Sequence, residues 1–139
     1  MVKVGEEKMA ESVRLLLDQV VSNLVELETL LFFHQNQSLI ENAEGVAHRL
    51  RREKREVAAA LETLADSGLL DRFELGAGRY VIYSFTEDPR LQEAISRLSH
   101  YFHEDPRLRV EIVKHIMGIR SRRASPPASP LAGGEGPEQ

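Results

Sequence analysis

The sequence predicts a mainly α-helical domain that carries one small β-hairpin and has helical extensions on both sides. Three observations lead to this fold class. Apolar residues recur at helical spacing through most of the first 67 residues, the period then changes to two, and helical spacing returns after residue 87. A chain of 139 residues is long enough for one compact domain with such extensions.

Composition and charge favour a globular protein of the cytoplasm. Apolar residues make up 42% of the chain and charged residues 29%, and no apolar stretch is long enough to span a membrane. The segment Met1 to Lys8 lacks the features of a secretory signal. Because the chain has no cysteine, disulfides, thiol catalysis and cysteine-ligated zinc are excluded. We therefore expect a cytoplasmic protein that does not associate with membranes.

The first element is expected to be one long helix, from about Glu6 or Ser12 to Phe33. Its apolar positions follow the heptad spacing 4, 3, 4, 3, 4 and are Val13, Leu17, Val20, Leu24, Leu27 and Leu31. Two interpretations of this broad apolar surface stay open: it packs against later helices of the same chain, or its N-terminal half packs against a second copy. On the second interpretation the dimerisation residues are Val13, Leu17, Val20 and Leu24.

A short helix and a longer one are expected next, separated by a basic turn. Asn42 is a good N-cap for a helix over 43–50. The longer helix runs to about Ser67, where Gly68 suits a left-handed C-terminal cap. It is expected to bury four residues at helical spacing, Val57, Ala60, Leu61 and Leu64. Between the two helices, residues 49–55 hold five positive charges and one negative, in a chain whose net charge is −4.

Alternation with a period of two predicts strands over 70–75 and 79–85, joined by a turn at Gly76-Ala77-Gly78. The segment 87–91, Glu-Asp-Pro-Arg-Leu, then recurs at 104–108. In each copy Asp is suited to the N-cap and Pro to the first helical position, which predicts helices over 88–103 and 105–117, the second ended by Gly118. The Ser-, Pro- and Gly-rich residues from Ser121 onward are expected to be disordered.

The order helix, helix, basic turn, helix, hairpin is typical of a winged helix-turn-helix domain, expected here over residues 24–86. The segment Glu44-Gly45-Val46-Ala47-His48-Arg49-Leu50 resembles the second-helix pattern of MarR-type and ArsR-type transcriptional regulators. Val57 with Leu61-Glu62-Thr63-Leu64 and Gly68-Leu69-Leu70 resembles their recognition helix and its exit into the wing. The remaining chain would then be an N-terminal helical extension (1–23), C-terminal helices (87–118) and a disordered tail (119–139).

The resemblance implies a homodimeric transcriptional regulator that binds double-stranded DNA and needs no cofactor. In such families the third helix enters the major groove with its N-terminal residues toward the bases. Six cations would contact DNA, four at the basic turn and two on the wing: Arg51, Arg52, Lys54, Arg55, Arg72 and Arg79. Glu62 would face the same groove together with Ala58 and Ala59, which weakens the case for DNA. A winged helix that binds a protein partner, or serves as an assembly subunit, therefore stays open as the alternative.

Neither catalysis nor a metal site is expected. Gly76-Ala77-Gly78 joins two strands, whereas a phosphate-binding loop joins a strand to a helix. His100 and His103 lie three residues apart beside Glu104, but a metal needs a third ligand and groups that orient the ligands. We interpret these histidines as surface or interface side chains.

Overall fold

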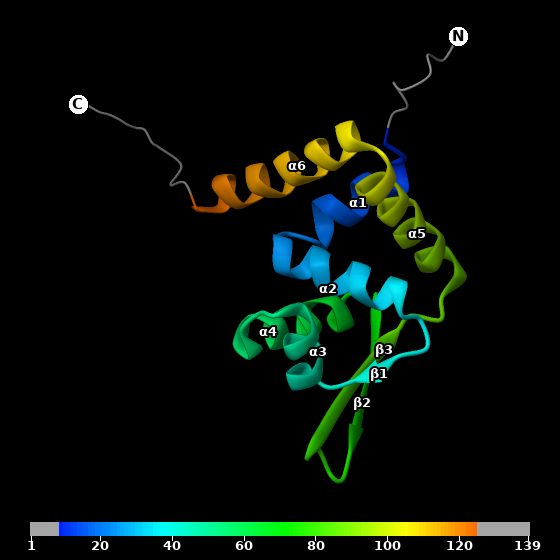
Figure 1. Cartoon of the computed structure of the whole chain (residues 1–139), viewed down its shortest axis with the longest axis vertical. Coiled ribbons are helices and arrows are strands. Elements are labelled where there is room, and N and C mark those ends of the chain that lie inside the picture. The colour runs from blue at the N-terminus through cyan, green and yellow to red at the C-terminus, as the bar shows by residue number, and fades with distance from the viewer. Residues whose placement is uncertain (1–8, 125–139) are drawn as a thin grey trace, which may run out of the picture.

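The computed structural model describes residues 9–124 of the chain. Within this range two helices, a short strand, two helices, a two-stranded hairpin and two final helices follow one another (Figure 1). Their bounds are α1 Glu11–Gln19, α2 Leu24–Gln35, β1 Ile40–Glu41, α3 Ala43–Leu50, α4 Lys54–Asp66, β2 Leu70–Leu75, β3 Tyr80–Phe85, α5 Pro89–Glu104 and α6 Pro106–Ala124. The predicted fold class, mainly α with a small β-hairpin, is confirmed.

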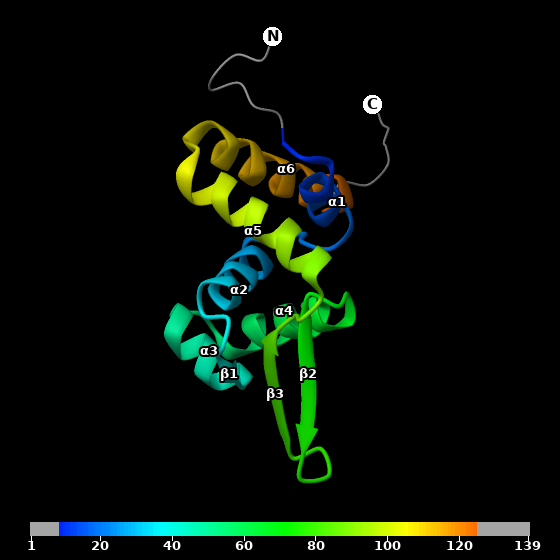
Figure 2. The same cartoon turned by 90° about the vertical axis from the view of Figure 1, so that its right-hand side faces the viewer.

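The elements are arranged in two groups along the long axis of the molecule (Figures 1 and 2). Helices α1, α5 and α6 lie at one end, α3, α4 and the sheet lie at the other, and α2 lies between the two groups. The buried apolar side chains form one cluster that extends from α1 to α6. Helix α2 contributes several of its largest members, so it is the element that joins the two groups.

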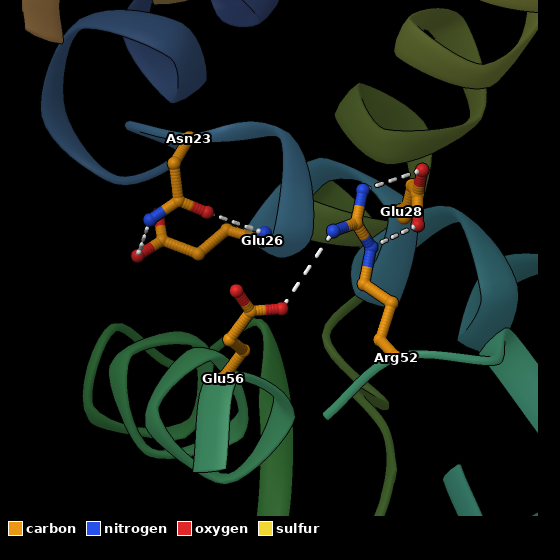
Figure 3. A network of polar contacts seen from close by, with 5 residues as sticks. All are labelled: Asn23, Glu26, Glu28, Arg52 and Glu56. Atoms are coloured by element: carbon orange, nitrogen blue, oxygen red, sulfur yellow. Dashed lines mark hydrogen bonds and ion pairs between the residues drawn. The ribbon is translucent and has the colours of Figure 1, made fainter. Parts of the chain in front are cut away.

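The expected single helix at the start of the chain is wrong, because the chain breaks between α1 and α2. The side-chain oxygen of Asn23 accepts a hydrogen bond from the backbone N–H of Glu26 at 2.8 Å (Figure 3). The Glu26 carboxylate accepts from the backbone N–H of Ser22 at 2.7 Å. This arrangement resembles a capping box and starts α2, with the difference that Glu26 accepts from the residue before the N-cap. The capping residues therefore break the helix, even though the heptad spacing of apolar residues continues through this part of the sequence.

Because the expected long helix is broken, the residues expected to form a dimer pack differently from the prediction. Val13 and Leu17 are buried inside the chain, where α1 packs against α5 and α6. Val20 and Leu24, at the break and the start of α2, are partly buried against the same core. The apolar surface of α1 thus packs mainly within the chain, and Val13 and Leu17 leave no surface on which a second copy can pack.

The middle of the chain has a winged-helix-like arrangement. Helices α2, α3 and α4 pack together beside a three-stranded antiparallel sheet with the order β1-β3-β2. The expected bounds of α3, the Asn42 cap and the left-handed Gly68 (φ 84°) are confirmed. So is burial of the four apolar residues on α4: Val57, Ala60, Leu61 and Leu64. Strand β1 was not expected, because its two residues show no alternation and become a strand only by pairing with β3.

Strands β2 and β3 form the predicted hairpin, and its turn contains one residue more than expected. The register pairs Leu70 with Phe85 at the base of the hairpin and Leu75 with Tyr80 at its tip. Arg79 belongs to the turn and not to the strand, and its N–H donates to the carbonyl of Gly76 at 3.2 Å. The hairpin projects beyond α3 and α4, so its tip is the most distant part of that end of the molecule (Figures 1 and 2).

The two C-terminal helices begin as predicted, but the second continues further. Asp88 accepts from the N–H of Arg90 at 2.9 Å and Asp105 from that of Arg107 at 3.1 Å, so both repeats act as N-caps. Helix α6 continues through Gly118 to Ala124, and the predicted end at Gly118 is therefore wrong. Glycine disfavours helix only mildly, by about 0.5–1 kcal/mol, and the helix continues through it. The expected disordered tail is also wrong up to Ala124, and its remainder lies outside the described residues.

Candidate nucleic-acid interface

Four of the six predicted DNA-contacting cations lie where α3 ends and α4 begins. We call this region, residues 51–55, the basic corner. Arg51 ends α3 in the left-handed conformation (φ 58°), and its N–H donates to the carbonyl of His48 at 3.3 Å. The N–H of Arg52 donates to the carbonyl of Ala47 at 3.1 Å. These two bonds use carbonyls that the end of α3 would otherwise leave unpaired, and they fix the backbone from which the side chains start.

Arg52 turns back into the protein and does not extend toward solvent with its neighbours. Its guanidinium donates two hydrogen bonds to the Glu28 carboxylate on α2, at 2.8 and 3.1 Å, and lies 3.7 Å from Glu56 on α4 (Figure 3). The hydrogen bond to Glu28 is the largest cause that raises the pKa of Arg52. The structure therefore places Arg52 as a bridge between α2 and the first turn of α4, away from the exposed cations of the basic corner.

Lys54 and Arg55 occupy the first turn of α4, and both side chains are exposed. Like Arg51, they form no ion pair with any residue between 9 and 118. The N-cap residue Glu53 makes no side-chain bond to the helix, so the first N–H groups of α4 have no side-chain acceptor at the N-cap. Free cations beside free helix N–H groups favour an anion such as a phosphate. The exposed Glu53 carboxylate is the one opposing charge within the corner.

Further along α4, Glu62 is held by the wing. Its carboxylate lies 3.2 Å from the Arg72 guanidinium and accepts from the Tyr83 hydroxyl at 2.7 Å. Arg72 also pairs with Glu74 at 2.7 Å. Burial raises the pKa of Tyr83, so its phenol keeps the proton that it donates. The charge of Glu62 is thus compensated inside the protein, and Arg72 is occupied by two carboxylates and does not extend freely from the wing.

Arg79 is exposed at the tip of the hairpin and forms no ion pair with the residues whose side chains the structure describes. The tip projects away from the basic corner (Figures 1 and 2). The six predicted residues therefore do not form one surface. Arg51, Lys54 and Arg55 lie together, Arg52 and Arg72 are tied to carboxylates, and Arg79 stands apart.

An open groove of about 400 Å³ lies beside the basic corner, between the start of α2 and the exposed side of α4. Its walls include Leu24 and Val25 from α2 and the small residues Ala59 and Ala60 from α4. Arg52 and Glu56 close one side, already paired with each other. Ala59 is exposed at this groove and has only a methyl side chain, so a partner can approach this part of α4 closely.

The acidic partners of this region were not predicted from the sequence. Glu28 pairs with Arg52 and Glu74 pairs with Arg72, and both carboxylates are still partly exposed to solvent. The sequence offered one signal for these ion pairs, the acidic residues Glu26 and Glu28 in a chain that also has a basic turn. It was not sufficient, because which cation meets which carboxylate depends on how α2 lies against α4.

The histidines do not come together as a metal site within the described part of the chain. Among those residues no group of three or more His, Cys, Asp and Glu side chains has the geometry to hold a metal ion. Both His100 and His103 are exposed, and the ring of His103 bonds to Gln35 on α2 at 2.9 Å. His103 thus joins α5 to α2, in line with its interpretation as an interface side chain.

Comparisons with known proteins do not extend this picture. No family model matches the chain, and no curated protein and no solved structure matches it either. Across residues 9–124, no helix is both long and apolar enough to cross a membrane. The basic corner and the wing are therefore the features from which a function can be inferred.

Proposed function

We propose that this chain is a DNA-binding transcriptional regulator that acts as a homodimer and places the first turn of α4 in the major groove. One observation carries the proposal: three exposed cations at or just before the N-terminal end of α4 form no ion pair with residues 9–118, while Glu56 and Glu62 along that helix are paired with Arg52 and Arg72. The third acid of α4, Asp66, lies at the opposite end of the helix. The free positive charge is thus concentrated at the end of the helix that winged helix proteins insert into DNA.

The predicted resemblance to MarR-type and ArsR-type regulators supports the same proposal. The segment 44–50 that carries the resemblance corresponds to α3, apart from its first residue Ala43, and residues 57–70 extend from α4 to the first residue of β2. In that arrangement α3 supports α4, and the hairpin acts as the wing. Arg51, Lys54 and Arg55 are the proposed DNA contacts, and Arg can also read guanine through two hydrogen bonds.

The test compares binding to a pool of random duplex DNA at several salt concentrations. Replacing Arg51, Lys54 and Arg55 together by Ala is expected to weaken binding by roughly tenfold to a thousandfold and to lower the salt slope by about 2–3. The matched control replaces three exposed cations of α5 and α6 by Ala, Arg90, Arg107 and Lys114. It changes the net charge equally, so a triple variant at the basic corner that behaves like this control would overturn the proposal.

A protein-binding winged helix is the second candidate, and one observation favours it. The outer face of the wing carries apolar side chains, whereas a wing that contacts DNA is expected to present polar and basic ones. An apolar protein interface responds weakly to salt, whereas phosphate neutralisation makes affinity fall steeply. A pull-down partner whose binding is unaffected by salt and by the triple substitution would favour this second function.

A further inference from the structure

One face of the hairpin is apolar and exposed. Phe73, Leu75 and Tyr80 are 46%, 51% and 62% exposed, and Ile82 is partly exposed on the same face. The register makes the face continuous, because Leu75 pairs with Tyr80 and Phe73 with Ile82. Side chains of paired residues in an antiparallel ladder lie next to one another on one side of the sheet. At the base of the hairpin the exposed Ile40 of β1, paired with Ser84, extends this surface, which we call the wing face.

The wing face is not the side that packs on the core. The opposite side of the same strands carries Leu70, Tyr83 and Phe85, which are buried, and the Arg72 pairs with Glu62 and Glu74. The hairpin thus has ion pairs on its inner side near the tip and large apolar groups on its outer side. Phe73, Leu75, Tyr80 and Ile40, each about half exposed, and the partly exposed Ile82 together present on the order of 400 Å² of apolar surface. The largest apolar patch on a soluble protein is typically of about this size and is often functional.

We propose that the wing face is the surface through which two copies of this chain pair, with the tip of each hairpin lying over the base of the other. In such a two-fold arrangement the same patch serves both copies. Phe73 and Ile82 form the middle row of the face and therefore lie nearest the two-fold axis. The tip row, Leu75 and Tyr80, then covers Ile40 and Ser84 of the other copy.

Charge complementarity fixes the direction of this pairing. Arg79 carries a positive charge at the tip, whereas Asp71 and Glu87 place negative charges at the base. Arg79 and Asp71 form no ion pair with the chain's own described side chains. Tip-over-base packing brings Arg79 of each copy to Asp71 of the other, twice in one dimer. Tip-over-tip packing would bring the two Arg79 side chains together, which is unfavourable.

The base of the wing face is hollowed where the tip of the second copy would lie. An open hollow of about 240 Å³ there is lined by Ile40, Ser84, Thr86 and Gln92 among others. Three apolar residues and several hydroxyl, amide and carboxylate groups line this hollow. They suit the Tyr80 ring, whose apolar body needs contact and whose hydroxyl needs a hydrogen-bond partner. Tyr80 is the most exposed aromatic residue of the wing face.

Other occupants fit the wing face less well. Residues 125–139 contain one large apolar side chain, Leu131, which is too few to cover the five of the wing face. DNA offers phosphates and polar base edges, which gain little from Phe73 and Leu75. A stable dimer interface buries about 800 Å² of accessible surface on each partner, and the apolar centre of the interface is only part of that area. The wing face therefore suffices for the core of a small interface, for which we expect an affinity at the weak end of the range, on the order of micromolar.

This inference adds the pairing surface to the proposed function and does not depend on DNA binding. Sedimentation of the full chain without DNA, over a range of concentrations around the micromolar, measures it directly. Phe73→Glu would place two like charges near the two-fold axis and is expected to weaken the dimer by at least about tenfold. The matched control is Val110→Glu, at a 52% exposed position of α6, which should leave the dimer unchanged.

Charge reversal tests the tip-over-base direction. Arg79→Glu and Asp71→Arg should each weaken the dimer, by roughly threefold to tenfold. The double variant restores opposite charges across the interface and should recover most of the affinity. Failure of the double variant to recover, after both single variants weaken the dimer, would overturn the proposed direction.

Because the chain has no cysteine, single-cysteine crosslinking gives a second readout that does not rely on a tolerated charge. Phe73→Cys, near the two-fold axis, should form a disulfide-linked dimer readily, whereas Val110→Cys should not. A chain that stays monomeric at all accessible concentrations would overturn the proposal. So would a dimer that Phe73→Glu leaves intact, or one that Val110→Glu disrupts. DNA binding that persists in a monomeric Phe73→Glu variant would leave the proposed DNA contact standing while locating the pairing surface.

Discussion

Arg52 is expected to stabilise the fold and not to bind DNA, and Arg52→Ala separates these two roles. The variant removes two hydrogen bonds to Glu28, at 2.8 and 3.1 Å, and the longer interaction with Glu56. Both partners are partly exposed, so solvent screens the pair. Exposed pairs contribute about 0.2–1 kcal/mol, and the two-pronged geometry puts this one near the upper end. Since packing of the Arg52 stem is removed as well, the free energy of unfolding should fall by about 1 kcal/mol.

Denaturant unfolding followed by circular dichroism measures this decrease, which for a chain of this size corresponds to a Tm lower by roughly 4 °C. A double-mutant cycle with Glu28→Gln should give a coupling energy of about 0.5–1 kcal/mol that shrinks as salt is added. The control is Arg97→Ala, whose pair with Glu93 lies within α5. That pair connects one turn of a helix to the next, and its removal should lower the free energy of unfolding by about 0.3–0.5 kcal/mol.

The same variant must also be assayed for DNA binding. At a temperature where Arg52→Ala is fully folded, its DNA affinity should stay within about threefold of that of the unsubstituted protein. The dependence of that affinity on salt should be unchanged, because it decreases only when a side chain that neutralises a phosphate is removed. An Arg52→Ala protein of unchanged stability but with much weaker DNA binding would refute this reasoning. Arg52 would then have to leave Glu28 and bind DNA directly.

Three further expectations concern stability. Burial, and then the charge of His103, lower the pKa of His34 below its ordinary value of 6.5. The unfolded chain therefore binds more protons, so this contribution to stability is present above about pH 6.5 and is lost as the pH decreases through the lowered pKa of the folded state. His34→Phe should flatten that loss in unfolding curves while keeping the edge-to-face contact with Phe85. Asn23→Ala removes the cap of α2 and should lower the free energy of unfolding by about 1 kcal/mol, against little change for the exposed Gln19→Ala. Gly68→Ala forces a side chain into the left-handed region at φ 84° and should cost roughly 1–2 kcal/mol by denaturant unfolding, whereas Gly118→Ala, within α6, should not destabilise. Unchanged pH dependence in His34→Phe, or unchanged stability in either of the other two variants, would contradict the corresponding expectation.

The elements that could be predicted from sequence are those whose signals are local. Asn42 and Gly68 bound the helices of the winged-helix-like part, and the two Asp-Pro segments start α5 and α6, because a cap acts within one turn of backbone. The break before α2 had a local signal as well, in Asn23 and Glu26, but the uninterrupted apolar period concealed it. Strand β1 had none, because two residues pair only when β3 is already in place.

The candidate site could be predicted only in part, for a related reason. The position of the basic corner follows from the helix boundaries, and the exposure of Lys54 and Arg55 follows from the phase of the buried residues on α4. Which cations remain free depends on contacts between elements far apart in sequence. Arg52 meets a carboxylate 24 positions away, and Tyr83 reaches Glu62 across 21 positions. No periodicity indicates such pairs.

The cluster of Glu62, Arg72 and Tyr83 has a consequence for how the two proposed surfaces behave together. It ties α4 to the strands whose other side is the wing face, so a shift of the hairpin must either move α4 or break these bonds. If DNA binding at α4 and pairing at the wing face both favour the same position of the hairpin relative to α4, the two binding events are thermodynamically linked, and the linkage is reciprocal. DNA that favours one tilt of α4 would then tighten the pairing of two copies by the same factor by which pairing tightens DNA. A protein too weakly associated to pair at low concentration would in this way become a dimer on its operator.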